Sequence, residues 1–240
     1  GKLAVMGENF RGISADIYIV KPTNYADSAA YAVETGKDGE KFLYLPAFMS
    51  EEDLKGVEAH IAPFDGIYAE GYYGVACAKK WGKKLFCGTG FNLANPVAVN
   101  QAAAFDYFAL SKELDFAEQR ELAAQNAFVL SAGKIKVMDF IYCPFGKTCS
   151  ACENKDEYIL TDSDKREFVL RRYKTAGGCR FELFNPADLV APQTFANVLI
   201  DLSALPMPVA KGVAAGYDDR EKLKELLPVS TSGHSKKSVL

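Results

Sequence analysis

Short apolar runs rich in β-branched and aromatic residues recur along the first half of the chain. They start at residues 16, 42, 64, 84, 106 and 127, so successive starts are separated by 20 to 26 residues. That interval fits a strand, a helix and two short loops, repeated. The runs are Asp16–Val20, Phe42–Pro46, Phe64–Ala69, Lys84–Cys87, Asp106–Leu110 and Ala127–Leu130.

The segments between these runs carry signals typical of helix starts. Ser50 precedes an acidic turn, and Asn95 precedes a proline at the first helical position. Asp115 with Glu118 three residues later resembles a capping box. Continuous apolar strands that alternate with capped helices predict a parallel sheet covered by helices. At least five similar consecutive units favour an α/β, TIM-barrel-like (βα)n scaffold, complete or incomplete, over an open sheet.

The strand–helix rhythm stops near residue 140. Tyr158–Thr161 and Glu167–Tyr173 flank a polar turn and predict a β-hairpin, and Arg180–Asn185 predicts a third short strand. Asn197–Leu202 followed by Asp219–Leu227 predicts one more strand–helix unit. The expected organisation is barrel-like repeats over 1–140, a cysteine-rich β insert over 141–186, a final strand–helix unit over 187–228 and a flexible tail over 229–240.

The composition is that of a folded globular protein, with 49% hydrophobic and 25% charged residues. The net charge of −3 shows no basic excess of the kind that marks nucleic-acid binders, although a local patch could still bind RNA.

No apolar run is long enough for a membrane span, and no leader resembles a signal peptide, so we expect no membrane partner and a cytoplasmic location. Because the chain begins with Gly1 and its first methionine is Met6, we expect a piece of a longer protein.

Four of the six cysteines lie within 37 residues, in the pattern Cys143-x5-Cys149-x2-Cys152-x26-Cys179. Structural zinc sites usually have two cysteine pairs, and only Cys149 and Cys152 form such a pair here. Three clustered cysteines and a remote fourth favour a 4Fe–4S iron–sulfur cluster, with zinc and plain buried thiols as the alternatives. Cys77 and Cys87 lie in apolar stretches and are interpreted as small buried hydrophobes.

Polar residues at the carboxyl ends of the predicted strands are candidates for a barrel site. Glu70 and Glu113 could act as acid/base groups or bind a cation, or could equally be solvated or salt-bridged. Ser111, beside Lys112, is a weak nucleophile candidate, because a serine at a strand end often only caps a loop. With two histidines, no HExxH and no GxSxG, the chain shows no recognisable protease constellation. The candidates for substrate binding are Lys21, Asn92 and Asn95.

Several of these motifs, in the same order, resemble peptidase family U32, the collagenase-like peptidases. The likeness covers roughly residues 15 to 205 and is greatest with the second, C-terminal barrel-like module of longer members. The step from Cys143 to Cys149 is one residue shorter than in the family, and Ser232-Gly233-His234 resembles a family Gly-His motif that residues 235–237 do not continue. The segments concerned are Phe91–Asn95, Leu110–Leu114, Val137–Pro144, the paired cysteines, Tyr158–Asp164, Cys179-Arg180 and Phe184-Asn185.

The resemblance implies one of several functions. Some members are described as peptidases, whereas others are iron–sulfur proteins needed to hydroxylate RNA or a quinone precursor. The latter implies a cluster held by Cys143, Cys149, Cys152 and Cys179, an RNA or small aromatic substrate, and an N-terminal module of the same full-length protein as partner. The alternatives are a non-catalytic recognition module stabilised by zinc or a cluster, and the peptidase that the family name describes.

Overall fold

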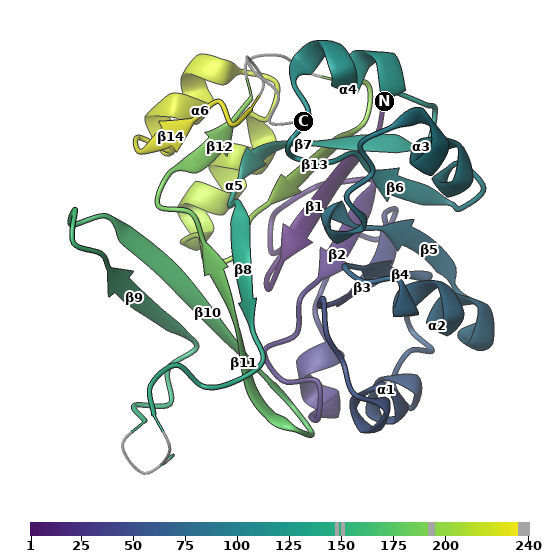
Figure 1. The fold of residues 1–240 in the computed structure, drawn as a ribbon, viewed down its shortest axis with the longest axis vertical. Coiled ribbons are helices and arrows are strands. Elements are labelled where there is room, and N and C mark those ends of the chain that lie inside the picture. Colours follow the sequence, from purple (N-terminus) through teal and green to yellow (C-terminus); the bar gives the residue numbers. More distant parts are fainter. Residues whose placement is uncertain (147–148, 150–151, 192–194, 235–240) are drawn as a thin grey trace.

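The computed structural model describes residues 1–146, 149, 152–191 and 195–234. Eight parallel strands follow one another around a ring that closes where β13 pairs with β7 (Figure 1). The predicted α/β, TIM-barrel-like fold is therefore confirmed, and the barrel is complete. Its strands are β1 (Leu3–Gly7), β2 (Ile17–Val20), β3 (Glu40–Leu45), β4 (Gly66–Ala69), β5 (Lys84–Cys87), β6 (Tyr107–Ala109), β7 (Ala127–Gly133) and β13 (Val198–Asp201).

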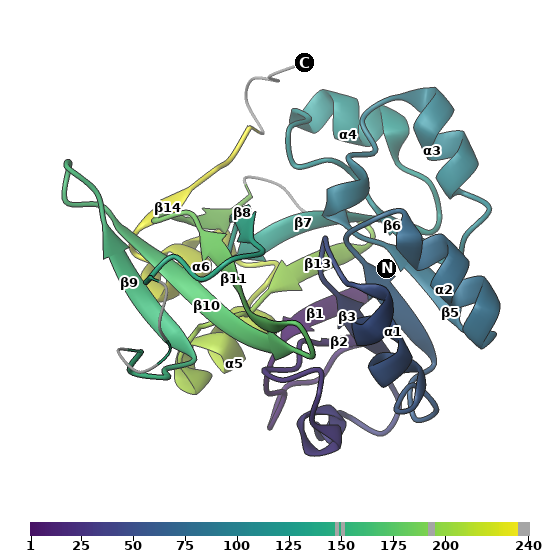
Figure 2. The same ribbon diagram turned by 60° about the horizontal axis from the view of Figure 1, so that its bottom comes forward.

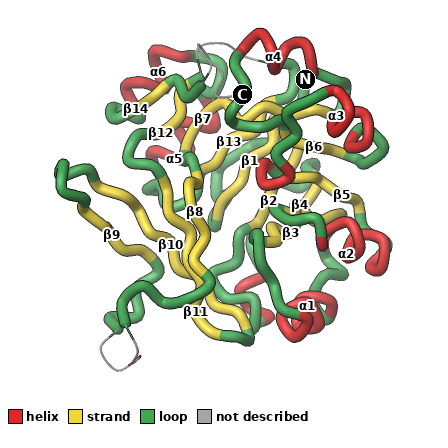
Figure 3. Tube along the Cα trace, viewed as in Figure 1, coloured by secondary structure: helices red, strands yellow, loops and turns green. Residues whose placement is uncertain are grey.

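Helices cover the outside of the barrel (Figure 3). They are α1 (Glu51–Glu58), α2 (Tyr73–Trp81), α3 (Pro96–Ala102), α4 (Phe116–Leu122), α5 (Met207–Ala215) and α6 (Arg220–Leu226), with single turns η1 (Ser28–Tyr31) and η2 (Thr89–Phe91). The expected caps are present: the Ser50 and Asp115 side chains accept N–H groups of the first turns of α1 and α4 in full capping boxes, and Asn95 accepts the Ala98 N–H at 3.0 Å. No helix in the described ranges combines the length and apolarity needed to cross a bilayer.

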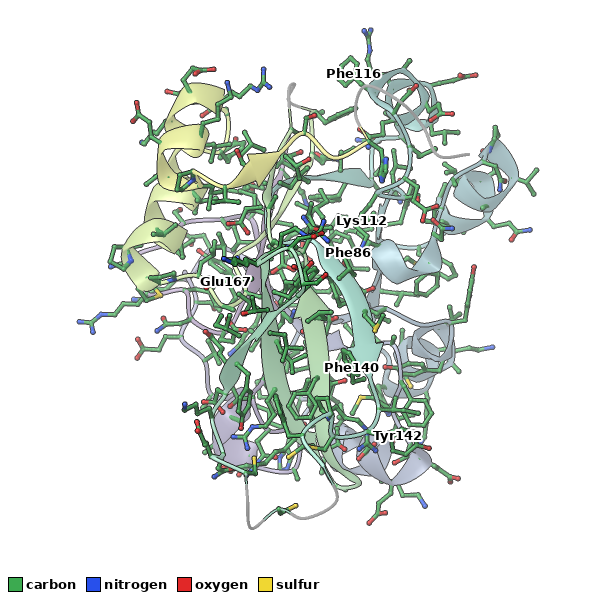
Figure 4. The ribbon with its side chains drawn as sticks, turned by 60° about the vertical axis from the view of Figure 1, so that its left-hand side comes forward. Phe86, Lys112, Phe116, Phe140, Tyr142 and Glu167 are labelled. Carbon is green, nitrogen blue, oxygen red and sulfur yellow. The ribbon has the colours of Figure 1, made fainter. Side chains whose placement is uncertain are left out.

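The barrel interior is packed with aromatic rings from successive strands. Phe86, labelled in Figure 4, lies 5.0 Å from Tyr68 and 4.9 Å from Phe128 between ring centroids. All three are fully buried, as is Phe42 on β3. Interlocked rings of this size fill the barrel as a solid core, so any site must lie at its ends.

A second, antiparallel sheet leaves the barrel after β7 and returns before β13. Figures 1 and 2 show it outside the ring of barrel strands, on the side away from α2 and α3. It begins at Lys136, so its first strand falls inside the range expected for the barrel repeats. Its order is β8 (Lys136–Phe140), β11 (Gly178–Phe184), β10 (Glu167–Thr175) and β9 (Glu157–Thr161).

Two short strands extend the barrel sheet beyond β7. β12 (Asp188–Val190) pairs antiparallel with β7, and β14 (Ser230–Thr231) pairs with β12. The expected flexible tail therefore contains a paired strand in its described part, and residues 235–240 lie outside the described residues. This pairing brings the C-terminal segment beside the carboxyl end of β7.

Candidate functional site

The carboxyl ends of the barrel strands carry charged residues, and the second sheet covers them with charges of its own. Lys21 follows β2, Glu70 follows β4, and Asp201 ends β13. The second sheet contributes Lys136 from β8 and Glu182 from β11. Lys21 and Glu182 are 1% and 0% exposed, so their charges are sealed from solvent.

Glu182 is the centre of this buried network. Its Oε2 lies 2.7 Å from Lys21 Nζ and 3.3 Å from Arg171 Nη1, and its Oε1 accepts the Tyr44 hydroxyl at 2.5 Å. Burial alone would raise the pKa of Glu182, but Lys21, Lys136 and Arg171 outweigh it and hold that pKa well below its usual range. Glu182 is therefore a buried carboxylate that stays charged.

Lys136 joins β8 to the same network. Its Nζ lies 3.0 Å from Asp139 Oδ2, 3.7 Å from Glu70 Oε2 and 3.1 Å from the Tyr44 hydroxyl. Burial lowers the pKa of Lys136, yet the surrounding carboxylates, Glu70 first, raise it above its usual value. Burial raises the pKa of Asp139 despite its contact with Lys136.

Arg171 attaches β10 to the barrel. Its guanidinium pairs with Glu8, which follows β1, and donates to the carbonyl oxygens of Lys21 and Pro22 at 3.0 and 3.1 Å. Removing one member of such a buried set leaves the others uncompensated, so the network holds the second sheet in a fixed position over the barrel.

The network almost fills the barrel mouth. The cavity among Lys21, Tyr44, Glu70 and Asp201 holds about 10 Å³, roughly the space for one water molecule. A second cavity of about 430 Å³ lies beside it, and Lys112, Leu130 and Lys136 line both. Its volume is that of a small-molecule site. Its walls come from the β6–α4 loop, the β7–β8 connection, the segment from Asn185 to Ala191, and residues 231–234.

The barrel residues singled out from the sequence separate into two groups. Lys21 and Glu70 belong to the sealed network. Ser111 and Glu113 line the larger cavity, together with His234 from the C-terminal segment. This cavity therefore brings together the strand-end loop and the Gly-His segment noticed in the sequence.

The remaining candidates have local structural partners. The Ser111 hydroxyl lies 2.5 Å from Asn92 Oδ1, its hydrogen-bond acceptor, and accepts the Glu113 N–H. Ser111 therefore contacts an amide oxygen instead of a base that could activate it. Asn95 caps α3. Asn92 has a left-handed backbone at φ 49°, which suits its place at the end of η2.

Several residues of the network were not recognised from the sequence, among them Lys136, Arg171 and Glu182. The available signal was an acidic residue inside the apolar run that became β11, where Glu182 lies between Phe181 and Leu183. Lys112 was noticed only as a neighbour of Ser111, although it lines both cavities.

The four clustered cysteines lie at the other end of the second sheet. Cys143 and Cys149 are exposed, Cys152 and Cys179 are partly buried, and all four are free thiols. In the part of the chain that the structure describes, no three His, Cys, Asp or Glu side chains gather closely enough to hold a metal ion. Residues 147–148 and 150–151, within the cysteine loop, lie outside the described residues.

Aromatic packing nevertheless joins the segments that bear these cysteines. The Phe145 ring lies 4.4 Å from that of Tyr158 and 5.8 Å from that of Phe181. Cys152 Sγ is 3.3 Å from the Tyr158 hydroxyl, and Cys179 lies two residues before Phe181. The Phe145–Tyr158–Phe181 cluster therefore has cysteines from three segments around it.

The cysteine end and the larger cavity lie toward opposite ends of β8. Cys143 comes seven residues after Lys136, which lines the cavity. In Figure 4, Lys112 and Tyr142 lie near opposite ends of β8. A molecule in the cavity would thus not touch a group held by these cysteines.

The two unclustered cysteines are buried, as expected. Burial raises the pKa of the Cys87 thiol to about 12 and also raises that of Cys77. Neither thiol is therefore poised to react.

Comparison with known proteins identifies no family. No family model and no curated protein matches the chain. One similar structure is the C-terminal domain of a putative chitinase from Desulfitobacterium hafniense DCB-2, at 9% identity and TM-score 0.37, covering 95% of this chain and 98% of that one. Another is the spore cortex-lytic enzyme SleL of Bacillus megaterium QM B1551, at 7% identity and TM-score 0.38, covering 83% and 70%. Similarity this low carries no argument about activity.

Proposed function

We propose that this chain is the iron–sulfur module of a U32-like, cytoplasmic enzyme that hydroxylates RNA or a small aromatic compound, working with an N-terminal module of the same protein. The family resemblance suggests the reaction. The structural observation that supports the cluster is the Phe145–Tyr158–Phe181 packing, which holds the segments of Cys143, Cys152 and Cys179 at one end of the second sheet.

Strand register adds to this support. Phe140 on β8 lies opposite Phe181 on β11. β8 ends at Phe140, three residues before Cys143, and Cys179 lies two residues before Phe181. The pairing of Phe140 with Phe181 therefore supports the proposal by joining the segment that leads to Cys143 to the strand that carries Cys179.

The donor set also fits the proposal chemically. Four thiols without disulfides and without a nearby histidine suit a cluster bound by four thiolates. When bound, such a cluster supplies one-electron redox chemistry. Arg172 fixes the segment after Cys152, because its Nη2 donates to the Asn154 carbonyl at 2.8 Å. The exposed Cys143 and Cys149 leave this end accessible to a partner module.

Anaerobic purification, followed by absorption spectroscopy and iron, sulfide and zinc analysis, tests the cluster. We expect a brown protein with about four irons per chain. Cys179→Ala should lose most of that iron, whereas Cys77→Ala, at a buried cysteine outside the cluster, should retain it. A colourless protein with one zinc, or iron content that is insensitive to Cys179→Ala, would contradict the proposal.

The reaction is tested in cells. Deleting the gene should lower the amount of one hydroxylated nucleoside or aromatic intermediate measured by mass spectrometry, and the Cys179→Ala variant should not restore it. Unchanged levels after deletion would refute the enzymatic part of the proposal without touching the cluster.

A second candidate is a recognition module that is not catalytic by itself. The observation that favours it is the barrel mouth, which the ion pairs of Glu182 and Lys136 reduce to about 10 Å³. Restoration of hydroxylation by a Cys179→Ala variant that has lost its iron would favour this candidate. The peptidase alternative has the least support, because the Ser111 hydroxyl donates to Asn92 Oδ1 and, among the described residues, to no base.

A further inference from the structure

Lys112, on the wall of the larger cavity, has no counter-ion among the residues that the structure describes. Its Nζ donates to the Lys136 carbonyl at 2.7 Å. Within the described ranges no carboxylate oxygen lies within 4.0 Å of that nitrogen. Its neighbours differ: Lys21 pairs with Glu182 at 2.7 Å, and Lys134 pairs with Asp188 at 2.8 Å.

The surroundings of Lys112 disfavour its charged form, because the ammonium is buried. Burial lowers the pKa of Lys112, and the attraction of Glu70 offsets only part of that effect. Glu70 itself lies 3.7 Å from Lys136 Nζ. One N–H of the Lys112 ammonium donates to the Lys136 carbonyl, which is neutral. The ammonium has three N–H donors, so it can also donate to an anion. A ligand with a negative group would supply the missing partner.

The rest of the cavity suits the apolar part of a ligand that carries a negatively charged group. Leu110, Leu114, Leu130, Ile135 and Leu189 form much of the wall. The polar amides are already engaged, since Gln119 donates to the Leu114 carbonyl and Asn185 to that of Ala187.

The other charged or titratable residues lining the cavity are few. Glu113 is exposed and lies toward solvent, and Lys136 is paired with Asp139. His234, which is exposed, lines the cavity from the C-terminal segment. Among them, Lys112 is the cation in the described lining that lacks an acidic partner.

We propose that this cavity binds a small organic anion, with its carboxylate or phosphate on Lys112 and its apolar body against Leu130, Ile135 and Leu189. The site does not depend on the clustered cysteines, because Tyr142, which precedes Cys143, lies near the opposite end of β8 from Lys112 (Figure 4). Its size excludes a folded partner and suits a molecule of one or two rings.

Isothermal titration calorimetry with matched probes tests the site on the full chain. The probes are benzoate, phenyl phosphate and the neutral benzamide. We expect one or both anions to bind at least about tenfold more tightly than benzamide, because a charge-assisted hydrogen bond replaces a neutral contact. The tighter of the two anions identifies the head group. Equal affinity for benzamide and both anions would overturn the proposal.

Two variants complete the test. Lys112→Met should lose the preference for anions, with at least about tenfold weaker binding, while Lys79→Met on the exposed face of α2 should bind as the parent does. Val137→Trp, at the 49% exposed rim, should weaken all three probes by narrowing the entrance.

Thermal unfolding separates binding from a structural role. Lys112→Met removes one hydrogen bond to the Lys136 carbonyl and no ion pair among the described residues, so it should lower the melting temperature by no more than about 2–4 °C. A larger fall in the melting temperature together with unchanged anion binding would show that Lys112 is structural and would overturn the proposal.

Discussion

Glu182 gives the sharpest test of how the second sheet is attached to the barrel. Glu182→Gln keeps the shape of the side chain and removes its charge. Arg171 would retain Glu8, and Lys136 would retain Asp139, but Lys21 would lose its only ion-pair partner in the described chain. The rings of Tyr44 and Phe184, 4.6 and 5.2 Å from Lys21 Nζ, replace only a small part of that attraction.

Losing one partner of a buried pair costs about 3–5 kcal/mol. Glu182→Gln should therefore lower the urea midpoint of unfolding by at least about 1 M. Glu225→Gln, at an exposed position on α6, is the matched control and should change the midpoint little. The double variant Lys21→Met/Glu182→Gln should be more stable than Glu182→Gln alone, because it removes the unpaired cation.

The pH dependence of the same variant has a definite sign. The pKa of Glu182 is lowered in the fold, so its contribution to stability is present above the unfolded value of about 4.3 and is lost as the pH falls through the folded pKa. The loss in free energy of unfolding caused by Glu182→Gln should be equal at pH 8 and pH 6 and should become smaller below pH ~4. A penalty under about 1 kcal/mol at pH 7, or a double variant no more stable than the single one, would refute the reasoning.

Three further predictions concern residues around the barrel mouth. Burial raises the pKa of Asp201, so the wild type should gain stability relative to Asp201→Asn as the pH falls from 8 toward the unfolded value of about 4. A difference in the free energy of unfolding that stays constant over this range would contradict the prediction. Tyr44→Phe removes a hydrogen bond to a buried carboxylate and should cost about 1.5–3 kcal/mol in urea unfolding, whereas no measurable cost would show that the bond to Glu182 is dispensable. Gly133→Ala should lower the free energy of unfolding by at least about 2 kcal/mol, because φ is +92° and a Cβ would lie 1.9 Å from the Asp201 carbonyl oxygen. Gly56→Ala in α1, which has open space around it, should instead raise the free energy of unfolding by about 0.5–1 kcal/mol. Equal effects of the two substitutions would contradict this prediction.

Most of the barrel could be read from local pattern. Each of the six apolar runs contains or overlaps a strand of the ring, from β2 to β7, and the predicted caps at Ser50, Asn95 and Asp115 start helices. The strand Leu3–Gly7 and the helix Met207–Ala215 were not predicted. Both lie outside the regular series of runs, where no repeat interval marked them.

The site could be predicted only in part. The positions after strands were the right places to look, because parallel strands bring their carboxyl ends to one face. The partners of Lys21 and Glu70 come from β8 and β11, far along the chain, and no local pattern relates residue 21 to residue 182. The four-cysteine cluster remains a prediction.

The sequence by itself determined the parallel barrel and its helical cover, because strand and helix preferences and hydrophobic periodicity act over a few residues. It also determined the spacing of the cysteines. Tertiary structure decided which charges are buried together and that Glu182 fills the barrel mouth. It also left Lys112 without a counter-ion, within the described part of the chain, beside a cavity of about 430 Å³. These outcomes depend on where the second sheet lies against the barrel. That placement is set by packing and by ion pairs between residues up to 163 positions apart, from Glu8 to Arg171.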